Sequence, residues 1–72
     1  MIFEKTFTKG KAMRTTDGKE INTDLIILRW LDNDGKSLTS WCFRGRGIEK
    51  DCQKLLDRIA LVSDFQLNEI RR

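Results

Sequence analysis

The chain has 72 residues, with 14 Lys or Arg against 11 Asp or Glu, and its formal net charge is +3 at pH 7. This length predicts a single small domain over residues 1–72, whose core supplies only about 3–5 kcal/mol of net stability. No apolar run approaches the roughly 18 residues of a membrane span, and the N-terminus lacks the pattern of a secretory signal, so we expect a cytoplasmic protein without membrane association.

The first part of the chain alternates as β-strands do. Residues 2–8 predict a half-buried strand. Gly10 is expected to end this strand or to form a bulge that leads into an extended segment over residues 11–16. Asp17-Gly18 then predicts a two-residue hairpin turn, because both residues tolerate positive φ.

Residues 21–31 predict a central strand, because both of its faces are largely apolar. One face carries Ile26, Leu28 and Trp30, and the other carries Leu25, Ile27 and Leu31. One helix covers only one face of such a strand. The second face therefore needs another cover, and we expect a homodimer.

A second turn and a third long strand follow. Asp32-Asn33-Asp34-Gly35 predicts a hairpin turn with Gly35 at positive φ. A calcium loop would require an oxygen ligand at the position of Trp30, so we expect no calcium site. Residues 37–44 predict a strand in which Trp41 and Phe43 share one face.

The helix has the clearest pattern in the chain. Residues 48–62 carry one apolar stripe with a period of 3.6 residues, formed by Ile48, Cys52, Leu55, Leu56, Ile59 and Val62. Gly47 can serve as its N-cap. For residues 63–72 we favour a short helix or an irregular tail over a strand. The predicted fold class is α+β: an antiparallel three- to four-stranded sheet followed by one C-terminal amphipathic helix packed on one face.

Catalysis has little support in the sequence. There is no His, which removes the commonest general base and nitrogen ligand for metals. Cys42 and Cys52 have no His partner, so ordinary zinc sites and a Cys–His nucleophile are excluded. Both cysteines are expected to be reduced and buried rather than paired. We expect no enzyme, no cofactor and no metal.

Nucleic-acid binding has better support, because it needs cations for phosphates and flat side chains for bases. Arg44-Gly45-Arg46-Gly47 places fixed charge and free backbone N–H groups at the start of the helix, which suits a phosphate. The candidate contact residues are Lys9, Lys11, Arg14, Arg29, Trp30, Trp41, Arg44 and Arg46. The alternative for Trp30 and Trp41 is that both belong to the core, since a small chain needs its large side chains inside.

Part of the chain resembles a known family. Residues 27–36, followed by a polar strand, Gly45-Arg46-Gly47-Ile48 and an amphipathic helix, are similar to the positive cofactor four family of single-stranded-DNA-binding transcriptional coactivators. The resemblance covers about half of the chain, from Leu25 to Ile59. It implies a curved antiparallel sheet with a helix behind it, dimerisation, and single strands that lie on the sheet. In this chain Glu49 starts the helix directly, without the short segment that the family inserts there.

The leading interpretation is therefore a non-catalytic nucleic-acid-binding module that prefers single strands. The alternative is a small protein-binding inhibitor or adaptor of the kind made by phages and mobile elements, with a larger protein as its partner.

Overall fold

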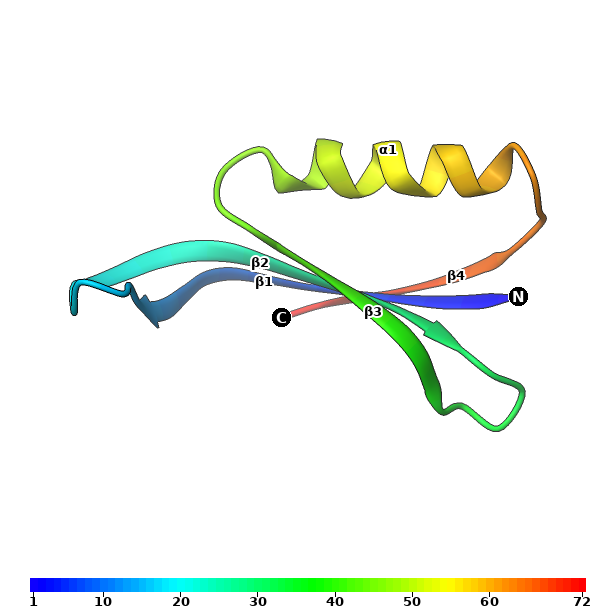
Figure 1. The fold of residues 1–72 in the computed structure, drawn as a ribbon, viewed down its shortest axis with the longest axis horizontal. Helices are drawn as coiled ribbons and strands as arrows, with labels where there is room; N and C mark the ends of the chain where they lie inside the picture. Colours follow the sequence, from blue (N-terminus) through cyan, green and yellow to red (C-terminus); the bar gives the residue numbers. More distant parts are fainter.

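The computed structural model describes residues 1–72 as a four-stranded sheet with one helix lying across one of its faces (Figure 1). The elements in chain order are β1 (Ile2–Arg14), β2 (Glu20–Leu31), β3 (Ser37–Arg44), α1 (Ile48–Ala60) and β4 (Gln66–Arg71). The prediction of the α+β class is confirmed.

The sheet has the strand order β3-β2-β1-β4 and is mixed. β2 is antiparallel to both β1 and β3, whereas β4 is parallel to β1. The chain therefore leaves β3 at one edge, crosses the sheet as α1 and returns as β4 at the other edge (Figure 1). The predicted all-antiparallel sheet with a C-terminal helix is wrong in this respect: the helix lies between β3 and β4.

The tail is a strand and not the predicted short helix or irregular segment. Phe65 and Leu67 alternate toward the core, and the rings of Phe65 and Phe3 meet edge to face with centroids 5.3 Å apart. Gln66 N–H donates to Met1 O at 2.9 Å, which begins the ladder to β1. Six residues are too few to show a strand locally, and their hydrogen-bonding partner lies at the other end of the chain.

Gly10 forms the predicted bulge. β1 runs without a break through it, and the pairing with β2 shifts between Thr8 and Lys11. Gly10 has φ 66° and its N–H donates to Asp24 Oδ1 at 3.1 Å. The two segments predicted at 2–8 and 11–16 are therefore one bent strand.

Both hairpins use a three-residue loop. Thr15 N–H donates to Lys19 O at 2.8 Å, and Gly18 N–H donates to Thr15 O at 3.0 Å. Gly18 and Gly35 have φ of 85° and 81°, and no non-glycine residue has positive φ. The predictions of a turn at each site and of positive φ at Gly35 are confirmed. A two-residue turn with positive φ at Asp17 is wrong, because the Gly alone supplies the left-handed conformation.

The core lies between α1 and the sheet. Its buried members are Phe3, Ile26, Leu28, Ile48, Cys52 and Leu56, and half-buried aromatic residues of β1, β2 and β3 pack around them. α1 ends at Ala60, two residues before the predicted end, and Leu61 and Val62 are 85% exposed. Gly47 is the N-cap as predicted.

Candidate functional site

A two-stranded arm extends from the sheet. β4 pairs with β1 only over residues 2–7, and β3 pairs with β2 only from Leu25 onward. Residues 9–23 therefore form a hairpin that projects past the helix (Figure 1), here called the arm. Nearly all of its side chains are exposed, so its sequence is free of packing constraints.

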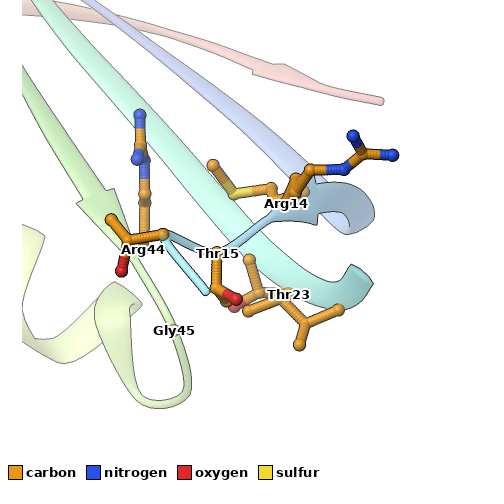
Figure 2. Close-up of a pocket in the computed structure, with 8 residues that line it drawn as sticks. Arg14, Thr15, Thr23, Arg44 and Gly45 are labelled. Carbon is orange, nitrogen blue, oxygen red and sulfur yellow. The ribbon is translucent and has the colours of Figure 1, made fainter. Parts of the chain in front are cut away.

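The arm meets the β3–α1 junction at a hollow of about 340 Å³, here called the arm hollow (Figure 2). Arg44 and Gly45 contribute from the end of β3, and the arm contributes from both of its strands. The lining residues are Met13, Arg14, Thr15, Thr16, Ile21, Thr23, Arg44 and Gly45. Two arginines and three threonines therefore contribute to the lining of one open depression, and in Figure 2 the Arg14 and Arg44 side chains extend away from each other. Both residue types can donate hydrogen bonds to an anionic ligand.

The pairing register places the charge of Lys11 on the same side of the sheet as that of Arg44. Lys11 pairs with Thr23, and Arg44 pairs with Leu25, so these side chains share a face. Lys9, Lys11, Arg44 and Arg46 are all exposed and none belongs to an ion pair. Their charges are available to a ligand.

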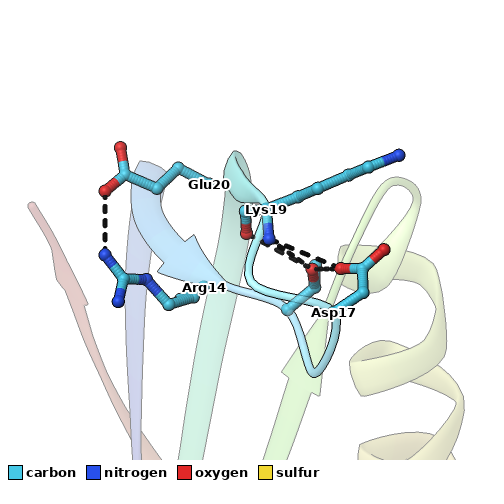
Figure 3. A network of polar contacts seen from close by, with 5 residues as sticks. Arg14, Asp17, Lys19 and Glu20 are labelled. Atoms are coloured by element: carbon cyan, nitrogen blue, oxygen red, sulfur yellow. Dashed lines mark hydrogen bonds and ion pairs between the residues drawn. The ribbon is translucent and has the colours of Figure 1, made fainter.

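Both acidic side chains of the arm, Asp17 and Glu20, interact with other residues of the arm (Figure 3). Arg14 Nη2 lies 3.4 Å from Glu20 Oε1, so the charge of Arg14 is partly compensated. Asp17 accepts hydrogen bonds from the Thr15 hydroxyl and from Lys19 N–H. The Thr15 bond, with a smaller contribution from Lys19, lowers the pKa of Asp17 below its ordinary value.

The Arg44–Gly47 junction connects the arm hollow to the helix. Gly45 has φ 113°, and its N–H donates to Asp24 O at 3.2 Å. Gly47 supplies no side-chain cap, so the first N–H groups of α1 have no side-chain capping partner. The sequence predicted the positions of Arg44 and Arg46 relative to the helix correctly.

The aromatic candidates lie elsewhere. Trp30 and Trp41 pack on the helix-facing side of the sheet, with their ring centroids 6.3 and 6.2 Å from that of Phe3. Arg29 points to the opposite face, where its Nε lies 3.3 Å from Glu4 Oε1. The structure therefore brings Arg14 and Arg44 to one hollow and places Lys11 on the same face as Arg44, but it separates Arg29 from both tryptophans.

The two tryptophans line a second hollow, of about 280 Å³, between the sheet and the C-terminal end of α1. It is here called the aromatic hollow, and its lining residues are Met1, Phe3, Trp30, Trp41, Leu55, Ile59, Val62 and Ser63. Because seven of these eight residues are hydrophobic, this hollow suits an apolar group rather than a phosphate.

Sequence reasoning missed the threonines of the arm hollow. Thr15 and Thr16 immediately precede the Asp17-Gly18 turn, and this clustering of hydroxyls at a hairpin tip was the available signal. No comparable signal in the sequence marked Thr23, because its position in the hollow depends on the bend of β1 at Gly10.

The cysteines differ from each other. Both are free thiols, and Cys52, a residue of α1, is buried as predicted, but Cys42 is exposed. The prediction of burial is wrong for Cys42 because its side of β3 faces away from the helix. Burial raises the pKa of the Cys52 thiol, although the nearby charge of Lys5 opposes this effect.

No group of three or more His, Cys, Asp or Glu side chains is arranged to hold a metal ion. None of the structure's helices has the length and apolar character needed to cross a membrane. No protein-family model, curated protein or solved structure matches this chain. The resemblance to the positive cofactor four family thus has no support from these comparisons and stays a prediction.

Proposed function

We propose that the protein is a non-catalytic nucleic-acid-binding module that contacts backbone phosphates through the arm and the β3–α1 junction. The observation that carries the proposal is the arm hollow, whose lining includes Arg14 and Arg44 together with Thr15, Thr16 and Thr23. Lys9, Lys11 and Arg46 are further exposed cations of the arm and the junction, and none of them belongs to an ion pair.

The charge balance of the surface supports an anionic ligand. Glu20 and Asp17 are engaged within the arm, and Asp24, next to the arm, accepts a hydrogen bond from Gly10 N–H. The unpaired cations Lys11, Arg44 and Arg46 are left with no acidic partner. Such a surface attracts a polyanion and releases its counterions on binding.

The same geometry favours backbone contacts over base contacts. The preference for single strands rested on Trp30 and Trp41 as stacking faces, and both pack toward α1 instead. A two-stranded β-ribbon also fits the major groove of a DNA duplex. We therefore propose phosphate-directed binding in which duplex and single strands both bind, without stacking on tryptophan.

A salt titration tests the proposal. A labelled single strand and a labelled duplex of equal length are titrated with the protein at several salt concentrations, with fluorescence anisotropy as the readout. The Arg44→Ala/Arg46→Ala double variant is expected to bind more weakly and to lower the log–log salt slope by about 1 per residue removed. Tryptophan emission is expected to stay nearly unchanged on binding.

The matched control is Lys50→Ala/Lys54→Ala, which removes the same charge from the exposed face of α1. This variant should bind almost as the wild type does. Absence of binding to either oligonucleotide at low salt contradicts the proposal, as does an equal loss of affinity in the two double variants.

A second candidate, a protein-binding inhibitor or adaptor, is favoured by the aromatic hollow and its apolar rim. Leu61 and Val62 are 85% exposed beside it, and Met1 is 49% exposed. Half-buried aromatic residues in a pocket with an apolar rim are typical of binding hot spots. In this case a candidate partner protein would change the tryptophan emission, Val62→Asp would abolish binding, and Arg44→Ala/Arg46→Ala would not.

A further inference from the structure

We propose that the sheet face opposite α1 is an interface with a second copy of this chain, and that the Glu4–Arg29 pair lies near its centre. We call this surface the open face. The inference does not depend on the proposed nucleic-acid binding, since the arm hollow and the centre of the open face involve different residues.

The open face has no cover within the chain. α1 lies over one side of the sheet, and no segment crosses the other (Figure 1). The pairing register assigns alternate residues of all four strands to this side. Its aliphatic members are Ile2, Leu25, Ile27, Leu31 and Ile70, and its uncharged polar members include Thr6, Thr8, Ser40, Gln66 and Asn68, together with Cys42.

The centre of the open face is poorer in charge than the exposed side of α1. Charged residues make up 35% of the chain, and the exposed side of α1 is dominated by them. Away from Arg44 at the arm end, the open face carries only Glu4 and Arg29. Ile27 and Ile70, by contrast, are 36% and 37% exposed there. Depletion of charge around exposed aliphatic side chains is the pattern of an interface core.

The one ion pair on this face is incompletely satisfied. Arg29 Nε lies 3.3 Å from Glu4 Oε1, yet it is buried and makes no hydrogen bond. That nitrogen has almost no accessible surface, so a facing molecule would meet the rest of the pair: the Arg29 and Glu4 side chains are 39% and 25% exposed.

Charge complementarity points to a second copy rather than to another partner. One positive and one negative charge leave the centre of the open face neutral, so it offers no attraction to a polyanion or to a strongly charged protein. A two-fold axis near the pair would set Arg29 of each copy against Glu4 of the other. The face is then complementary to itself, as an isologous interface requires.

The size of the sheet is adequate for such a contact. With a rise of about 3.3 Å per residue and about 4.8 Å between strands, the four strands without the arm present roughly 460 Å² of area on this side. Projecting side chains increase the accessible area above this value, toward the ~800 Å² per partner of a standard interface. Sheets that pack face to face in this way form a common type of core.

Oligomeric state is the first test. Light scattering across a wide concentration range is expected to give a mass near twice the 8.5 kDa of one chain, falling at high dilution. Ile27→Lys should weaken the dimer at least tenfold. Val62→Lys adds the same charge at an exposed apolar residue near the end of α1 and should leave the dimer unchanged.

Charge reversal gives a sharper test. Glu4→Arg makes the centre of the face doubly positive, and Arg29→Glu makes it doubly negative. Each variant alone is expected to be monomeric, whereas an equimolar mixture should form a heterodimer. Circular dichroism and thermal unfolding check that each variant is folded. Formation of the heterodimer on mixing is a second check, because an unfolded variant could not form it.

Three results would overturn the proposal. The first is a monomeric mass for the wild-type chain at every concentration. The second is a dimer that survives Ile27→Lys but dissociates with Val62→Lys, which would place the interface at the aromatic hollow. The third is a pair of folded reversal variants that stay monomeric on mixing. If the open face binds an oligonucleotide instead of a second copy, the protein should be monomeric, and Ile27→Lys should change its affinity for the oligonucleotide.

Discussion

Lys5 and Glu69 form an ion pair on the helix-facing side of the sheet, where Lys5 Nζ lies 3.6 Å from Glu69 Oε1. The Lys5 side chain is 8% exposed and that of Glu69 is 51% exposed. The pair joins β1 to β4 at one of the parallel register positions. A cation is thereby held at the margin of the apolar core, with its carboxylate partner half in solvent.

This asymmetry predicts unequal effects of removing either partner. Glu69→Gln leaves the buried ammonium without its counter-charge, so we expect a loss of about 1–2 kcal/mol in the free energy of unfolding, between the values for exposed and buried pairs. Lys5→Met removes the buried charge and keeps the volume, so it should be neutral or stabilising. Urea denaturation of both variants checks this, and a larger loss for Lys5→Met than for Glu69→Gln would contradict it.

Phe65 is expected to anchor β4 to the core. Its ring meets that of Phe3, which is 1% exposed, edge to face. Phe65 itself is half-buried, so Phe65→Ala should cost about 2 kcal/mol, below the range for fully buried Phe. Leu61→Ala, at an 85% exposed residue, should stay within about 0.5 kcal/mol of the wild type. Equal stability of the two variants would show that β4 contributes little to folding.

The two thiols should react at different rates. Cys42 is exposed, while Cys52 is fully buried and burial raises its pKa. In native protein a thiol reagent should modify Cys42 quickly and Cys52 only after unfolding, with the products identified by mass spectrometry. In a Cys42→Ser variant the thiolate absorbance should appear at higher pH in the folded chain than in urea. Because its folded pKa is raised, Cys52 contributes stability at neutral pH that is lost as the pH rises from its ordinary pKa through the folded value.

The stability of the turn at the tip of the arm should depend on pH in the opposite sense. The pKa of Asp17 is lowered chiefly by the Thr15 hydroxyl, so this carboxylate stabilises the turn above its ordinary pKa. That contribution disappears as the pH falls through the folded pKa. NMR titration should give a midpoint for Asp17 in the folded chain below that of the same residue in urea, and Thr15→Val should raise the folded midpoint. An unchanged midpoint in Thr15→Val would assign the effect to other groups.

The sequence by itself determined the elements whose signals are local. The 3.6-residue stripe gave α1 to within two residues of its C-terminal end, and Gly10, Gly18 and Gly35 marked the bulge and both turns. Alternation along residues 21–31 also placed Ile26 and Leu28 on one face, and both are fully buried there. These features follow from backbone sterics and from the periods of helix and strand, which involve only near neighbours in the chain.

Only the tertiary structure decided how these elements combine. β4 is a strand because β1, some sixty residues earlier, offers it a free edge, and this contact leaves no periodic trace in the tail. Alternation separates Arg29 from Trp30, but packing alone decides that α1 covers the tryptophan side. The arm hollow likewise exists because the bend at Gly10 brings Thr15 near Arg44. Long-range contacts form because they bury whole faces of the sheet and helix. That burial depends on residues from several distant elements, so no short stretch of sequence predicts it.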